Sequence, residues 1–166
     1  MERWLFTPLT SLIPVALLVM LTIGCGKQVP TEFKDLCPTT ITIVQNGTPL
    51  EGASVALTPL GGGSYSAGGT TDAKGEVVIY TQGDFQGAKP GKYRVSVIKE
   101  TRTRNEGVTY AQGQQVTPEQ RKAEFTIRTF VDPKYTSSRM SPLEIEIKPG
   151  ENNQTFDLGD PVDKVL

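Results

Sequence analysis

Short runs in which apolar and polar residues alternate restrict the fold of this chain more than any other feature. The clearest run is Lys92–Lys99, in which Tyr93, Val95 and Val97 alternate with polar or exposed-type neighbours. Successive side chains of a β-strand point to opposite faces, so this period of two predicts a half-buried strand. We expect this strand to lie at the centre of the core.

Similar strand signals recur along the chain, and turn signals separate them. The runs are Thr39–Gln45, Ala53–Thr58, Glu76–Thr81, Leu143–Lys148 and Gln154–Leu158, with a further start near Phe125. Asn46-Gly47 is typical of a tight hairpin turn, because both residues tolerate positive φ. The chain also holds 17 Gly and 12 Pro, which suits many turns. The pattern predicts an all-β fold, a single β-sandwich of about seven strands within residues 38–160.

An apolar run near the start of the chain ends in a small residue and a cysteine. Leu12–Ile23 is 12 residues long, which suits a secretory signal and falls short of the ~20 residues of a membrane-spanning helix. Gly24 leaves room for a peptidase at the backbone, and Cys25 offers a nucleophilic sulfur. We therefore predict a signal peptide over residues 1–24, with cleavage between Gly24 and Cys25.

The segment Leu21-Thr22-Ile23-Gly24-Cys25 resembles the lipobox of bacterial lipoproteins. The resemblance implies that Cys25 is the lipid attachment site, that residues 25–37 form the lipidated N-terminus and a tether, and that the membrane is a partner. In such lipoproteins, an aspartate directly after the lipidated cysteine favours retention at the inner membrane. This chain has Gly26 at that position, so the resemblance implies the outer membrane. Two alternatives stay open: an uncleaved anchor helix, and an ordinary cleaved signal that leaves Cys25 free or paired with Cys37.

Composition narrows the possible functions. The net charge is −1, which gives no reason to expect a nucleic-acid partner. The chain has no histidine, which excludes Ser-His-Asp and Cys-His catalysis and His-ligated metal sites. We therefore expect no catalytic residues, no cofactor and no metal. Asp72 in Asp72–Gly75 could be a turn residue or a calcium ligand. We expect the turn, because one carboxylate is too few to bind calcium.

Two further groups have both a structural and a functional interpretation. If Cys25 carries lipid, Cys37 is unpaired, and we expect a buried, inert thiol. Glu144 and Glu146 share one face of a strand, at a spacing that would suit a catalytic site of two carboxylates. An ordinary solvated pair is the favoured interpretation, since that face alternates with the apolar one.

The segment around residues 100–130 is expected to be an insertion in the sandwich. Thr117-Pro118-Glu119 predicts the start of a short helix, with Thr117 as its N-cap. Lys92–Arg128 holds 8 basic and 4 acidic residues. One hypothesis is a binding insertion for an anionic surface polymer; the other, which we favour, is a solvated surface excursion. Residues 161–166 are expected to form a loose tail.

The amino-acid sequences of several turns and adjoining strands resemble those of carboxypeptidase regulatory-like domains. The matching segments are Asn46–Val55, Gly69–Glu76, Pro90–Val97 and Ser141–Leu143. The resemblance implies a transthyretin-like, prealbumin-type sandwich of Greek-key topology. Hydrolases and dioxygenases of that fold need histidines, so their activities are not implied. An internal Lys–Asn isopeptide, known from adhesin domains of similar shape, is not expected, because Thr39–Gln45 lacks a lysine.

Together these observations predict a non-catalytic, membrane-anchored lipoprotein of the cell envelope, with a structural, adhesive or accessory role. The alternative is a carbohydrate- or peptidoglycan-binding module, in which exposed aromatic rings stack on sugars. Its candidates are Tyr65, Phe85, Tyr110 and Tyr135, and we single out Tyr110 and Tyr135 as ligand-binding residues. In either case the partner would be a cell-envelope polymer or protein.

Overall fold

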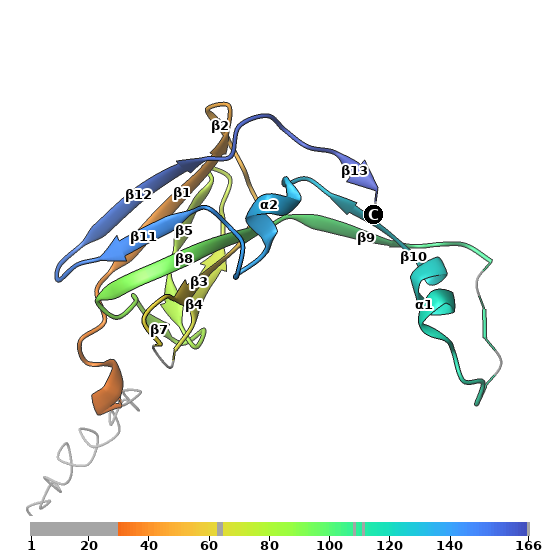
Figure 1. Ribbon diagram of the computed structural model, residues 1–166, viewed down its shortest axis with the longest axis horizontal. Helices are drawn as coiled ribbons and strands as arrows, with labels where there is room; N and C mark the ends of the chain where they lie inside the picture. Colours follow the sequence, from red (N-terminus) through yellow and green to blue (C-terminus); the bar gives the residue numbers. More distant parts are fainter. Residues whose placement is uncertain (1–29, 63–64, 108, 111, 166) are drawn as a thin grey trace, which may run out of the picture.

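A computed structural model describes residues 30–62, 65–107, 109–110 and 112–165 of the chain. It confirms an all-β sandwich, with a smaller sheet that projects from one side (Figure 1). The predicted signal peptide and Cys25 lie outside the described residues. The elements are η1 (Thr31–Phe33), β1 (Thr39–Gln45), β2 (Thr48–Pro49), β3 (Ser54–Pro59), β4 (Ala67–Thr70), β5 (Glu76–Val78), β6 (Tyr80–Thr81), β7 (Phe85–Gln86), β8 (Gly91–Ile98), β9 (Glu100–Arg104), α1 (Pro118–Glu124), β10 (Phe125–Thr129), α2 (Pro133–Thr136), β11 (Glu144–Ile147), β12 (Asn152–Asp157) and β13 (Lys164–Val165).

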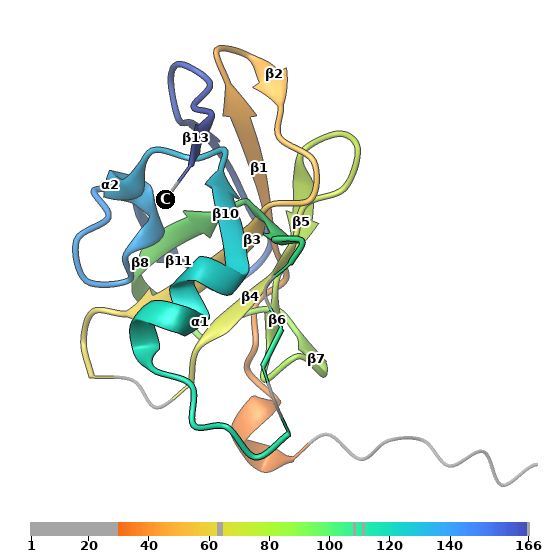
Figure 2. The same ribbon diagram turned by 90° about the vertical axis from the view of Figure 1, so that its right-hand side faces the viewer.

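Two sheets pack face to face, as Figure 2 shows with β1 and β5 on one side and β3, β4 and β8 on the other. In the first sheet, β1 pairs with β12 in parallel and with β2 and β5 antiparallel. The second sheet has the order β11-β8-β3-β4-β6-β7. The expected central strand is confirmed, since β8 lies between β3 and β11.

The core lies between these sheets and follows the predicted alternation. Ile41 and Ile43 of β1 are fully buried, as are Val95 and Val97 of β8, and Leu57 of β3. Burying each such side chain stabilises the fold by about 1.5–3 kcal/mol. The sandwich is therefore held mainly by apolar side chains that alternate along its strands.

The chain changes sheets at Ile79, where sequence alone predicted one strand from Glu76 to Thr81. β5 pairs with β1, whereas β6 pairs with β4 of the other sheet. The backbone N–H of Ile79 still donates to the carbonyl of Thr39 at 3.0 Å, and its side chain is fully buried. A strand that crosses between sheets keeps its alternation, so its period could not reveal the break.

The structure contains a further strand, β4, over Ala67–Thr70, which was not among the predicted strands. A Cβ atom on Gly69 would lie 2.6 Å from Cγ2 of Val77 and 2.8 Å from the carbonyl oxygen of Val78. Glycine is thus required here by a close approach of β4 to β5. The strand was missed because glycines normally disfavour strands.

The predicted insertion forms a projecting arm, which we define as residues 100–130 together with β13. β9 continues the direction of β8, pairs with β10 and leaves the sandwich, and α1 lies at the far end (Figure 1). Gln45 donates from Nε2 to the carbonyl of Phe130 at 2.9 Å, which fastens the base of the arm to β1. The expected loose tail is wrong in part, because β13 pairs with β10.

The tether that was expected to reach residue 37 ends sooner. η1 begins at Thr31, and Phe33 is only 4% exposed. Its ring stacks on Phe85, with 4.5 Å between centroids. The chain is therefore packed on the sandwich from η1 onward.

Candidate functional site

A pocket opens at the end of the sandwich where η1 docks, and we call it the tyrosine–lysine pocket. It has a volume of about 290 Å³. Its walls are formed by Tyr65, Thr81, Lys89, Lys92 and Tyr93, and its rim by Pro59, Gly61, Pro90 and Gly91. Segments from β3, β6, β8 and the loop before β4 meet there. The pocket therefore exists only in the folded chain.

Both tyrosine rings of the pocket are held in place. Tyr65 packs edge-on against Phe33, with 5.0 Å between ring centroids. The nearby Glu32 carboxylate, with a smaller contribution from burial, raises the pKa of Tyr65 above 10.0, so its hydroxyl stays protonated. Tyr93 donates its hydroxyl proton to the carbonyl of Lys89 at 2.9 Å, and burial raises its pKa. The walls are thus ordered without a ligand.

Lys89 gives the pocket a positive group, whereas Lys92, which precedes the inward-facing Tyr93 on β8, has its side chain on the outer face of the sheet. Nζ of Lys89 lies 5.5 Å from the centroid of the Tyr65 ring. No described carboxylate forms a salt bridge with Lys89 or Lys92. Glu146 stands directly opposite Lys92 in the β8–β11 ladder. The pocket therefore offers an aromatic ring beside the Lys89 ammonium group, which is a setting for a polar, negatively charged ligand.

The residues singled out as ligand-binding do not come together. Tyr135 lies on α2, is 8% exposed and belongs to the core, so it cannot offer a free ring face. Tyr110 lies at the far end of the arm, where its hydroxyl donates to the carbonyl of Gln120 at 2.7 Å. The expectation that Tyr135 is exposed is therefore wrong. Asp132 caps α2 by accepting from the N–H of Lys134, but the burial of Tyr135 depends on how α2 packs on the core.

Of the other predicted aromatics, Tyr65 lines the pocket and Phe85 packs against Phe33. Sequence reasoning missed Lys89 and Lys92. The signal available for them was the run Lys89-Pro90-Gly91-Lys92-Tyr93, in which a tight turn brings two lysines beside a buried tyrosine. The run does not reveal that Tyr65, from the loop before β4, lines the same pocket.

The arm carries a second, more open hollow of about 480 Å³ on one face of its sheet. Thr101, Thr103, Asn105, Thr126, Arg128, Phe130 and Val165 line it. Three of the eight basic residues of Lys92–Arg128 form ion pairs. Arg104 pairs with Glu124 at 2.7 Å, Arg128 with Asp163 at 2.7 Å and Arg94 with Glu144 at 3.2 Å. The arm therefore offers weaker attraction to an anionic polymer than its sequence suggests.

The remaining candidates have structural surroundings. Glu144 and Glu146 are exposed on β11, and Cys37 is 7% exposed within the core. Asp72 forms the expected turn, since its Oδ1 accepts from the N–H groups of Lys74 and Glu76 at 2.8 and 2.9 Å. Among the described residues, no three His, Cys, Asp or Glu side chains gather as a metal site would require. Helices in this part of the chain are all too short or too polar to cross a bilayer.

Comparisons with known proteins add little to this geometry. No protein-family model matches the chain, and no curated protein matches it. Among solved structures, the chain is similar to a 9R-lipoxygenase from Cyanothece PCC8801, with 17% sequence identity and a TM-score of 0.35. The match covers 79% of this chain and 18% of the lipoxygenase chain. A similarity this weak supports no statement about activity.

Proposed function

We propose that this protein is a non-catalytic lipoprotein of the cell envelope, anchored through a lipid on Cys25, with the sandwich as a structural, adhesive or accessory module. The observation that carries the proposal is the short apolar run that ends in Gly24-Cys25. Two or more acyl chains are needed for stable anchoring, and lipoprotein processing supplies them in proteins with this type of signal. The Gly26 that follows suits the outer membrane.

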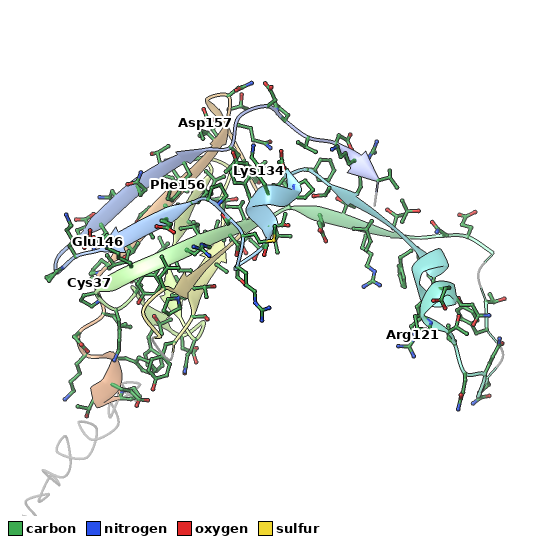
Figure 3. All side chains as sticks on the ribbon, in the orientation of Figure 1. Cys37, Arg121, Lys134, Glu146, Phe156 and Asp157 are labelled. Atoms are coloured by element: carbon green, nitrogen blue, oxygen red, sulfur yellow. The ribbon has the colours of Figure 1, made fainter. Side chains whose placement is uncertain are left out.

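The packing of η1 adds a geometric consequence. Six residue steps separate Cys25 from Thr31, and an extended chain spans at most about 3.6 Å per step, or about 20 Å in all. The η1 end of the sandwich would then stay close to the membrane surface. α1 lies at the opposite end of the long axis (Figure 1). Figure 3 places Arg121 at that far end. Anchoring would therefore present the arm away from the attachment point.

The test is the intact mass of the native protein from the membrane fraction, compared with a Cys25→Ser variant. We expect a chain that starts at Cys25 and carries added lipid mass, and a variant that lacks this mass. A native chain that keeps residues 1–24, or that is released without lipid, would contradict the proposal. Fractionation of inner and outer membranes by density would test the outer-membrane location separately.

A second candidate function is the binding of an envelope saccharide, and the tyrosine–lysine pocket favours it. The pocket holds Tyr65, one of the aromatic residues expected to stack on sugars, together with hydrogen-bonding groups. Pull-down of the full chain with purified peptidoglycan and with surface polysaccharide tests this candidate. Binding that is lost in Tyr65→Ala and kept in Tyr110→Ala would support it. Absence of binding to every envelope polymer would rule it out.

A further inference from the structure

We propose that the tyrosine–lysine pocket is a binding site for an acidic sugar, a hydroxylated ring that carries a carboxylate or phosphate. The inference rests on the second candidate function, the binding of an envelope saccharide, and names its ligand class. Tyr65 and Lys89 are the residues that would recognise such a ligand.

The size of the pocket limits the ligand. Small-molecule sites usually range over about 300–1,000 Å³, and this pocket, at about 290 Å³, lies at the lower end. One sugar ring with its substituent suits this volume, whereas a helix or a long peptide does not. Pro59 and Pro90 stiffen the rim, and the N–H of Leu60 donates to the carbonyl of Lys92 at 2.9 Å, which ties the two sides together.

The ring of Tyr65 provides the surface on which a sugar would stack. An aromatic face is electronegative and attracts the polarised C–H groups of a sugar ring. Phe33 contacts the Tyr65 ring edge-on, and Glu32 interacts with its hydroxyl, so the ring is oriented before a ligand arrives. Such pre-ordering lowers the entropic cost of binding.

Lys89 accounts for the recognition of the acidic group. Lys89 lies over the same Tyr65 ring, so an anion attached to a stacked sugar would be near its ammonium group. Hydrogen bonds between an ammonium and an anionic oxygen are about twice as strong as neutral ones. The carboxylate of Glu32 faces Tyr65 from η1 and limits the positive potential of this region. The site therefore suits a ligand with one acidic group on an otherwise polar, neutral ring.

An acidic sugar ring has two sources in an envelope: a soluble or polymeric saccharide, and the headgroup of a glycolipid. The pocket lies beside η1, at the end that the proposed lipid anchor would hold near the membrane. Both sources present the same chemistry. The experiment therefore includes one arm for each.

The first arm titrates the full chain, purified in detergent micelles, with glucuronic acid, glucose and inorganic phosphate by calorimetry. We expect glucuronic acid to bind at least about tenfold more tightly than either of the others, since one charge-assisted contact is worth about that factor. Lys89→Gln should weaken the binding of glucuronic acid about tenfold or more, and Tyr65→Ala should weaken it further than Tyr65→Phe. Lys74→Gln, an exposed lysine in the turn before β5, is the matched control and should bind normally.

Three outcomes would overturn the inference. Equal affinity for glucose and glucuronic acid would leave saccharide binding in place and exclude the acidic-sugar preference. Equal affinity for phosphate and glucuronic acid would show a simple anion site. Absence of binding to all three probes, with unfolding midpoints unchanged among the variants, would reject both this inference and the monosaccharide site beneath it.

The second arm reconstitutes the chain in phosphatidylcholine vesicles with and without a glucuronic-acid glycolipid. Protection of the pocket backbone from hydrogen exchange in the glycolipid vesicles, without protection by free glucuronic acid, would assign the headgroup as the source. Protection by free glucuronic acid alone would assign the saccharide. Protection in neither condition would contradict the proposed site.

Discussion

β9 of the arm continues the direction of β8 of the sandwich, but the two regions differ in how they are stabilised. β8 buries Tyr93, Val95 and Val97 between two sheets, whereas every residue of β9, just beyond Lys99, is exposed. Pairing to a neighbouring strand is present in both regions. What the arm lacks is a second layer, and isolated small sheets are only marginally stable without one.

The contacts that remain in the arm are weaker individually. Arg128 and Asp163, which link β10 to the segment before β13, are each more than half exposed, and exposed ion pairs contribute about 0–1 kcal/mol. Arg102 lies 4.1 Å from the centre of the Phe125 ring, another surface contact. We therefore expect the arm to open locally at a much lower free energy than the sandwich.

The largest expected effect separates these regions directly. Leu57→Ala removes a fully buried side chain from β3 and should lower the free energy of unfolding by about 2–5 kcal/mol. Ile127→Ala, on partly exposed β10, should lower it by less than about 1 kcal/mol. Urea unfolding measures both. Equal losses would show that the arm unfolds together with the core.

A second substitution tests the close approach within the sandwich. Gly69→Ala places a methyl group against Val77 and the backbone of Val78, and should cost about 1–3 kcal/mol. Gly61→Ala is the control, since no atom lies within 4 Å of its added Cβ and its φ is not positive. Thermal unfolding of the two variants checks the difference. A neutral Gly69→Ala would mean that β4 and β5 can separate freely.

The third prediction is local to the arm. Thr117 and Gln120 cap α1 reciprocally: the N–H of Gln120 donates to Oγ1 of Thr117 at 3.3 Å, and the N–H of Thr117 donates to Oε1 of Gln120 at 2.9 Å. Thr117→Ala should destabilise α1 by about 0.5–2 kcal/mol. Amide exchange should accelerate in α1 while exchange in β8 stays unchanged. Faster exchange in both would contradict the independence of the arm.

The smallest expected effect is a pH dependence at α2, near the base of the arm. The N–H of Lys134, helped by the Lys134 charge, holds the pKa of Asp132 below the usual 3.8. Because the pKa is lower in the folded state, the stabilising contribution is present above about pH 4 and is lost as the pH falls through the folded value. NMR titration should give a midpoint below 3.8 for Asp132. A midpoint above 3.8 would show that the cap is not formed.

The pattern of the chain was enough to predict its short-range structure. Asn46 and Gly47 adopt φ of 46° and 76°, as the expected hairpin turn requires. Thr117 caps α1 as predicted, and the inward faces of β1 and β8 follow the alternation. These features depend on the conformational preferences and hydrogen bonds of neighbouring residues, so a few consecutive side chains decide them.

Only the tertiary structure decided which distant segments meet. The sheet change at Ile79, the pairing of β13 with β10 and the burial of Tyr135 all depend on how the layers close. The same holds for the pocket, where Tyr65 meets Lys89 and Lys92 across a loop. The conformational preferences of neighbouring residues are compatible with several ways of packing the two sheets. Burial of the whole apolar core selects one of these arrangements. The sequence therefore determined most of the core strands, the turns and the likeness to a lipoprotein signal, whereas β4, the sheet change at Ile79 and the pocket were decided by packing.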